Sequence, residues 1–209
     1  WPGPNSSGLR YETAWDSIQA KDGGAAHPAN NLREIFGKDD RVAVYQYRVR
    51  DAIQGMLGQG EAGAQVSYSG GLIENVASLG QAGQLGYSGG WADALREARS
   101  WTTDGGHPRL DIVQFAFHHA LLPLVHPEVA RMELLLYQEV YGEAWGGGAQ
   151  SRGLFPSEMA FGEHLIPVLE EVGIDWVIVS NSHISRACED YPREPGSGGD
   201  NIPPPNQAD

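Results

Sequence analysis

The chain has little cysteine and little positive charge. Its only cysteine, Cys188, excludes an intrachain disulfide, and no Cys/His set has the spacing of a zinc finger. Fourteen Lys and Arg residues stand against twenty-seven Asp and Glu residues, giving a formal net charge of -13. Because a phosphate backbone would be repelled unless a local basic patch existed, and none is visible, we expect no nucleic-acid partner.

Long apolar runs are absent as well. No run approaches the roughly 18 to 20 residues that a bilayer-spanning helix needs, so we expect no membrane span. The acidity and the single cysteine fit a cytoplasmic and a secreted protein equally. Composition therefore assigns neither the compartment nor the oligomeric state.

What the sequence does contain is enough apolar material for a folded domain. The 209 residues are 41% hydrophobic, which can bury a substantial core. Apolar positions at three- and four-residue steps predict helices, and short runs of β-forming residues predict strands between them. Helices are expected at about 14–20, 41–56, 72–79, 91–102, 127–141 and 161–172, and strands at about 65–68, 110–117, 153–156 and 175–180.

This alternation of strand and helix indicates an α/β fold. Strands that read as nearly continuous apolar runs are typical of a parallel sheet covered by helices. Four strands are too few for a barrel of eight, so the sheet is open or the chain is part of a barrel. We expect one segment with a loop-rich region at 1–40, a β/α core at 41–185 and a Pro/Gly-rich loop or tail at 186–209.

Polar residues with chemical capability follow the predicted strands. In parallel α/β folds the catalytic groups lie where strands end, at the carboxyl edge of the sheet. The Ser69–Gly71 turn is one such place, although Ser-Gly-Gly is most often only a turn. His118 and His119 would point in opposite directions from an extended backbone, so one of them is expected to be a packing or hydrogen-bonding residue. The loop from Ser180 to His183 follows the last strand.

Glu158 is the most informative of these residues. It stands in FPSEMAF, residues 155 to 161, where it interrupts an apolar stretch at a strand-to-helix junction. Burying a carboxylate there is costly unless it is hydrogen-bonded or needed for function. A glutamate in a first helical turn also simply stabilises the helix dipole, so both interpretations stand on spacing alone.

Three motifs, in the same order, resemble glycoside hydrolase family 57. The run GLFPSEMAFGEHLIPVLEEVGIDWVIV is similar to that family's segment of an aromatic or apolar residue, a proline and a glutamate before Ala-aromatic, a helix and a Trp-Val-Ile strand. RLDIVQFAFHHALLPLV resembles its strand ending in His with a Leu-Pro-Leu turn, and VSYSGGLIENVASLG its earlier strand and helix. The resemblance covers about residues 60 to 185.

The resemblance implies a distorted seven-stranded (β/α) barrel, incomplete in this chain, that acts on α-glucans by a retaining mechanism without a cofactor. On this basis Glu158 matches the nucleophile and His119 the motif histidine near the sugar. Asp111 stands where the family usually has Glu, and its motif implies sugar binding. Residues expected to complete the substrate site are Ser69, Phe161 and His183.

The departures from the family leave two alternatives open. The His-Gln-Pro motif of the first strand is absent, and the acid/base aspartate of a later strand has no convincing counterpart, so the chain resembles an internal segment. One alternative is a metal-dependent polysaccharide deacetylase or mannosidase-like enzyme, in which His118, His119, His183 and Asp111 hold a divalent cation. The other is a non-catalytic carbohydrate-binding segment that lacks the second carboxylate.

Overall fold

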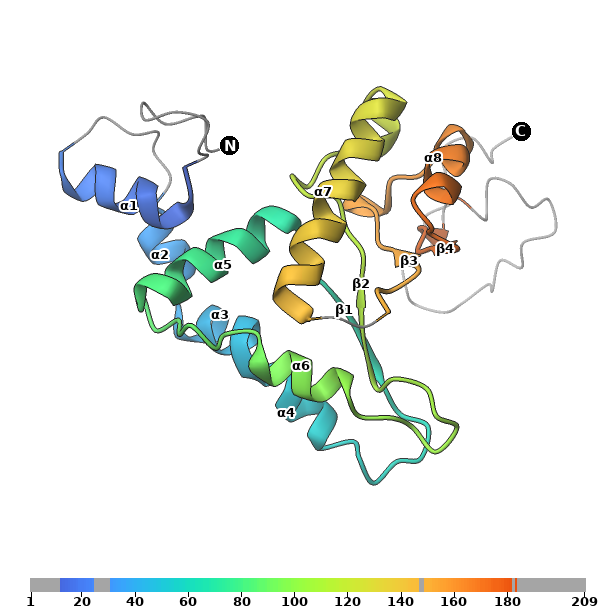
Figure 1. The fold of residues 1–209 in the computed structure, drawn as a ribbon, viewed down its shortest axis with the longest axis horizontal. Helices are drawn as coiled ribbons and strands as arrows, with labels where there is room; N and C mark the ends of the chain where they lie inside the picture. The colour runs from blue at the N-terminus through green and yellow to red at the C-terminus, as the bar shows by residue number, and fades with distance from the viewer. Residues whose placement is uncertain (1–11, 25–30, 147–148, 182, 184–209) are drawn as a thin grey trace, which may run out of the picture.

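The computed structural model describes residues 12–24, 31–146, 149–181 and 183. Strands and helices alternate through most of this range, as Figure 1 shows. The helices are α1 (Ala14–Asp22), α2 (Leu32–Phe36), α3 (Asp39–Ala43), α4 (Val49–Gln54), α5 (Gly70–Ala82), α6 (Asp93–Arg99), α7 (Pro127–Trp145) and α8 (Ile166–Glu171), and the strands are β1 (Ala64–Ser67), β2 (Leu110–Val113), β3 (Gly153–Leu154) and β4 (Trp176–Val177).

The strands are parallel and lie beside one another in chain order. β1 pairs with β2 from Ala64↔Leu110 to Ser67↔Val113, and β3 pairs with β4 through Gly153↔Trp176 and Leu154↔Val177. A single parallel bridge, Gln114↔Leu154, connects the two pairs. The predicted α/β class with parallel strands is therefore confirmed.

The strands are shorter than the sequence predicted. The expected strand 110–117 ends at Val113, because its partner β1 ends at Ser67 and the chain then leaves the ladder to begin α5. Ser69 is the N-cap of α5, and its Oγ accepts the Leu72 N–H at 3.3 Å. Residues 117–118 form a turn, so the two consecutive histidines do not stand on an extended strand.

Helices cover the strands and bury their apolar residues. α7 runs alongside β1 and β2, with α5 packed on α7 and α1 packed on α5 (Figure 1). Leu110 and Ile112 of β2 are 1% and 0% exposed, and Leu134 and Tyr137 of α7 are both 0% exposed. The helix expected at 127–141 therefore packs on the sheet, and the Tyr137 hydroxyl donates to the Val113 carbonyl of β2.

The N-terminal region is more helical than its composition predicted. The expected short helix at 14–20 is α1, whose N-cap Thr13 forms a capping box with Asp16. α2 was not predicted, because it is only five residues long and its helical signal is local capping by Asn31. The expected helix at 41–56 is a continuous helical stretch, α3, a π-helical segment Val44–Arg48 and α4. The predicted tail at 186–209, with Cys188, lies outside the described residues.

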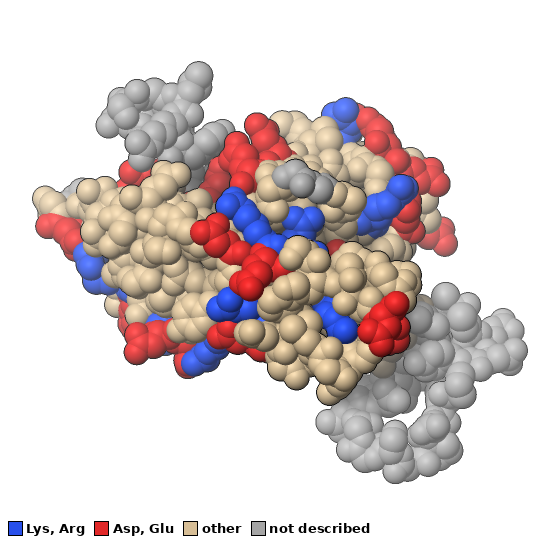
Figure 2. Space-filling model, turned by 60° about the horizontal axis from the view of Figure 1, so that its bottom comes forward, with Lys and Arg blue, Asp and Glu red and all other residues tan. Residues whose placement is uncertain are grey.

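Opposite charges are mixed on the face shown in Figure 2, where Lys and Arg side chains stand among Asp and Glu side chains. Arg50 pairs with Glu97 at 2.8 Å and Arg96 with Asp93 at 3.1 Å. Across the described part of the chain, no helix combines the length and the apolar content that crossing a bilayer requires.

Replacing Gly153 with alanine is expected to destabilise the β3–β4 pair. A β-carbon at Gly153 would overlap the indole ring of Trp176, its partner in the register. Overpacking of this kind costs about 1–3 kcal/mol, and urea unfolding measures it. The control is Gly58→Ala, because nothing lies within 4 Å of a β-carbon there. Equal unfolding free energies for the two variants would contradict the packing argument.

Candidate active site

Three predicted site segments lie at the carboxyl edge of the parallel strands. The Ser69–Gly71 turn follows β1, His118 and His119 follow β2, and Glu158 follows β3. The first two are in direct contact, since the Gly71 N–H donates to the Phe117 carbonyl at 2.9 Å. Gly70 lies against the Phe117 ring so closely that a β-carbon would overlap it. The strand direction and these contacts bring the turn and the histidines together as predicted.

Glu158 has an unusual backbone conformation. Its φ is 57° and its ψ is 20°, and Met159 after it also has a positive φ of 53°. Left-handed backbone costs a non-glycine residue on the order of 1–3 kcal/mol and clusters at functional sites. Ser157 before it is 0% exposed, whereas the Glu158 side chain is exposed. The Glu158 carboxylate is therefore exposed at the carboxyl end of β3, and the left-handed backbone that places it there costs free energy.

The Glu158 carboxylate makes no hydrogen bond or ion pair with the described residues. The nucleophile hypothesis requires donors or a cation beside the ionised carboxylate. Those partners are not found in this part of the chain. The role of Glu158 stays a prediction.

His119 shares the left-handed conformation and faces the β3 side. Its φ is 61°, and its ring centroid lies 5.0 Å from that of Phe115. Phe115 in turn lies 5.9 Å from Phe155, whose N–H donates to the Gln114 carbonyl at 2.9 Å. An aromatic chain therefore leads from His119 to the segment that carries Glu158. His119 and Glu158, which the sequence analysis proposed for the site, thus both have a positive φ.

His118 points to the helices, where it meets a buried acid. Both carboxylate oxygens of Glu133 on α7 bind this one residue: Oε2 accepts its backbone N–H at 2.7 Å, and Oε1 lies 2.7 Å from its Nδ1. Glu133 is 7% exposed. Near them, burial raises the pKa of the Glu74 carboxyl on α5, while His118 lowers it. His118 is thus the hydrogen-bonding member of the histidine pair.

Asp111 lies at the other edge of the strands. It is the second residue of β2, and its Oδ2 accepts a hydrogen bond of 3.0 Å from Ser151 Oγ. It lines a cavity of about 950 Å³ with Arg96, Arg99 and Trp145, where β1 and β2 begin. Because parallel α/β enzymes react at the carboxyl edge, this cavity is not the candidate active site. The structure does not bring Asp111 to Glu158.

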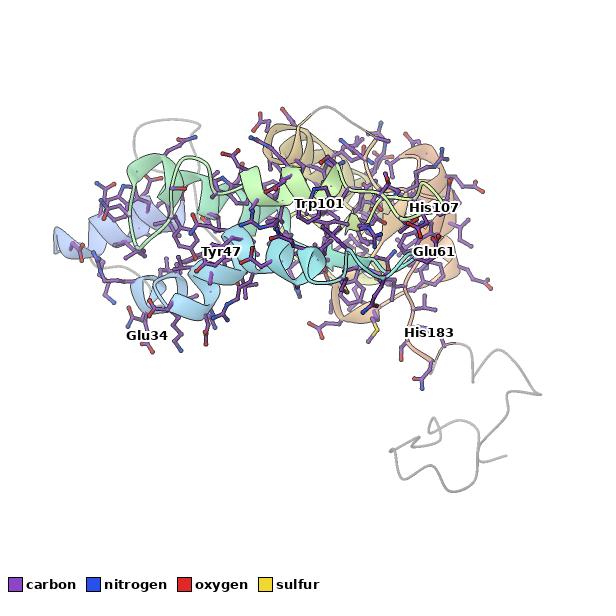
Figure 3. The ribbon with its side chains drawn as sticks, turned by 90° about the horizontal axis from the view of Figure 1, so that it is seen from below. Glu34, Tyr47, Glu61, Trp101, His107 and His183 are labelled. Atoms are coloured by element: carbon purple, nitrogen blue, oxygen red, sulfur yellow. The ribbon has the colours of Figure 1, made fainter. Side chains whose placement is uncertain are left out.

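The other predicted substrate residues are placed differently. Ser69 is engaged as the α5 cap, and burial raises the pKa of its neighbour Tyr68, which is 5% exposed. Phe161 is half-buried and packs against the hydrophobic core. His183 lies on a segment that leaves the packed body of the molecule, as Figure 3 shows. Of these three residues, Phe161 belongs to the segment that carries Glu158.

The metal-site alternative finds no support in this arrangement. In the described ranges, no three His, Cys, Asp or Glu residues gather as a metal-binding group. Of the four ligands proposed for it, His118 is bound by Glu133, Asp111 lies at the opposite edge and His183 lies apart.

Comparison with known proteins gives the family of this site. The family model described as glycosyl hydrolase family 57 matches residues 95–193, which include β2, β3, β4 and Glu158. An α-amylase of Niallia circulans is 34% identical over 230 residues, covering 99% of this chain and 17% of that relative. The chain belongs to glycosyl hydrolase family 57.

This family 57 chain shares the fold of a solved 4-α-glucanotransferase structure. A 4-α-glucanotransferase from Thermococcus litoralis aligns with a TM-score of 0.54 and 19% identity over 76% of this chain and 22% of that one. An α-amylase from Thermotoga maritima aligns with a TM-score of 0.46 and 17% identity over 80% of this chain and 39% of that one. The chain thus spans well under half of each of these proteins and of the Niallia relative.

Sequence reasoning missed Glu133, the residue that binds His118. Its helix buries Ala130, Leu134, Tyr137 and Tyr141, so Glu133 falls on the apolar face. A charged residue at a core position of an amphipathic helix is the signal that would have found it.

Proposed function

We propose that the polypeptide containing this chain is a retaining glycoside hydrolase or transglycosylase acting on α-glucans such as starch or malto-oligosaccharides. One observation carries the proposal: Glu158 stands in a left-handed conformation at the carboxyl edge, inside the family 57 match. The α-amylase name of the Niallia circulans relative supports an α-glucan as the substrate.

The proposed architecture is a distorted seven-stranded (β/α) barrel of which this chain forms one wall. Adjacent parallel strands in the order β1, β2, β3, β4 support it, because a doubly wound sheet reverses its order at a switch point. Glu158 and His119 then face the end of the barrel where substrate binds.

In the proposed mechanism Glu158 attacks the anomeric carbon. A covalent glycosyl-enzyme forms, and water or a second sugar then displaces the carboxylate. A retaining enzyme needs a second carboxyl group about 5–5.5 Å away to protonate the leaving oxygen. Asp111 lies at the opposite edge, so we assign the proton donor to another residue. Phe155 and Phe161 form the apolar walls around Glu158, and His119 donates or accepts a hydrogen bond from the sugar.

The test measures reducing-sugar release from soluble starch by the polypeptide that contains this chain, with the product anomer followed by NMR. We expect α-configured products first, as double displacement requires. Products of inverted configuration would overturn the nucleophile assignment. Binding of malto-oligosaccharide without any release would instead favour the non-catalytic carbohydrate-binding alternative.

A further inference from the structure

We propose that Glu133 and His118 form a positioning pair that holds His119 in its left-handed conformation at the substrate site. This inference rests on the proposed function, because it takes His119 to be a substrate-binding residue. His118 lies in one of the motifs that led to the family, whereas Glu133 lies outside all three of them. The inference depends on the contact between α7 and the turn after β2.

Glu133 holds His118 through both of its carboxylate oxygens, and we call these two hydrogen bonds the clamp. A buried carboxylate is costly unless its oxygens are hydrogen-bonded, and here both oxygens bind the same residue. One bond fixes the backbone N–H of His118 and the other its imidazole ring, each at 2.7 Å. Two bonds from one rigid helix to one residue fix both its position and its orientation.

The residue that follows needs such a clamp. His119 has a φ of 61°, which is strained for a side chain with a β-carbon. The turn's own hydrogen bond, from the His119 N–H to the Ala116 carbonyl, is long at 3.3 Å. Because His118 and His119 share a peptide unit, fixing the first residue restricts the backbone of the second. The contact of Gly71 with the Phe117 carbonyl holds the turn from the other side.

The direction of the two rings separates their roles. The His118 side chain is 42% exposed, and it contacts the helices through Glu133 on α7, bonded to its Nδ1, and through Glu74 on α5, which is close enough to interact with it electrostatically. His119 stacks beside Phe115, on the way to Phe155 and the Glu158 segment. His118 therefore acts through His119 and is a positioning residue.

The experiment uses variants of the complete polypeptide that contains this chain, assayed for malto-oligosaccharide turnover well below their melting temperatures. Glu133→Ala is expected to lower kcat/KM by roughly 10- to 100-fold, the effect of misplacing a site residue by about 1 Å. His118→Asn places an amide nitrogen where Nδ1 lies, so it should keep a kcat/KM close to that of the parent. His118→Gln places its amide nitrogen where Nε2 lies instead, so its kcat/KM should be as low as that of His118→Ala. The matched control is Glu139→Ala, an exposed glutamate on the same helix.

Hydrogen exchange of the peptide over residues 115–120 supplies a readout that needs no activity. Exchange should accelerate in Glu133→Ala and stay slow in His118→Asn and Glu139→Ala. The reverse order, with His118→Gln active and His118→Asn impaired, would mean that His118 contacts sugar directly and would overturn the positioning role. Losses that only follow melting temperature would overturn it too. If the parent releases no sugar but exchange follows the expected order, the proposed function fails and the clamp stands.

Discussion

Replacing Glu158 with glutamine is expected to lower turnover of an activated aryl α-glucoside by about 10⁴-fold, the scale found when a covalent nucleophile is removed. Glutamine keeps the size and most of the hydrogen-bonding capacity of the side chain but removes the negative charge that attacks the anomeric carbon. Because Glu158 is exposed and makes no hydrogen bond or ion pair with the described residues, the melting temperature and the affinity for glucan should stay near those of the parent. Turnover and thermal melting are measured in parallel on the same preparations.

A smaller replacement separates a nucleophile from a residue of structural importance. In Glu158→Ala, azide should restore part of the turnover, since a small anion can occupy the space of the lost carboxylate and attack in its place. The control is Glu163→Ala, an exposed glutamate five residues further along the chain. Turnover of Glu158→Gln close to that of the parent, or reduced only in step with melting temperature, would show that the carboxylate is structural.

Replacing Arg109 with methionine is expected to reduce the free energy of unfolding by roughly 3 kcal/mol or more, because several carbonyls lose a charged donor at once. Arg109 is 3% exposed, and its guanidinium donates at 2.7–2.9 Å to the carbonyls of Gln59, Ala62 and Thr102. It thereby joins the loops before β1 and β2, which carry Glu61 and His107 side by side in Figure 3. Urea unfolding measures the loss.

Two controls define the Arg109 effect. Arg109→Lys should be intermediate, because a lysine has three donors and no planar fork to reach carbonyls on separate loops. Arg48→Ala removes an exposed ion pair with Asp40 and should change stability by no more than about 1 kcal/mol. An Arg109→Met variant as stable as Arg48→Ala would contradict the structural role given to the guanidinium.

The candidate site was predictable where local pattern and strand direction decide it. Glu158 interrupts an apolar run just after a strand, and strand ends of parallel sheets meet at one edge, so Glu158 and His119 were expected together. Asp111 was assigned to the same site through the family resemblance. The register, with Asp111 opposite Gln65 near the start of both strands, places it at the other edge instead.

The amino-acid sequence by itself determined the α/β alternation and the helix that begins at Pro127, and it predicted that Glu158 follows a strand, because each depends on residues within a few positions of one another. Only the tertiary structure decided that Glu133 clamps a residue fifteen positions away and that Arg109 joins loops about fifty positions apart. Only it showed the left-handed backbone of His119 and Glu158. Such features have no periodicity to read, because they arise when distant segments pack and when the surrounding contacts offset the cost of a strained residue or a buried charge.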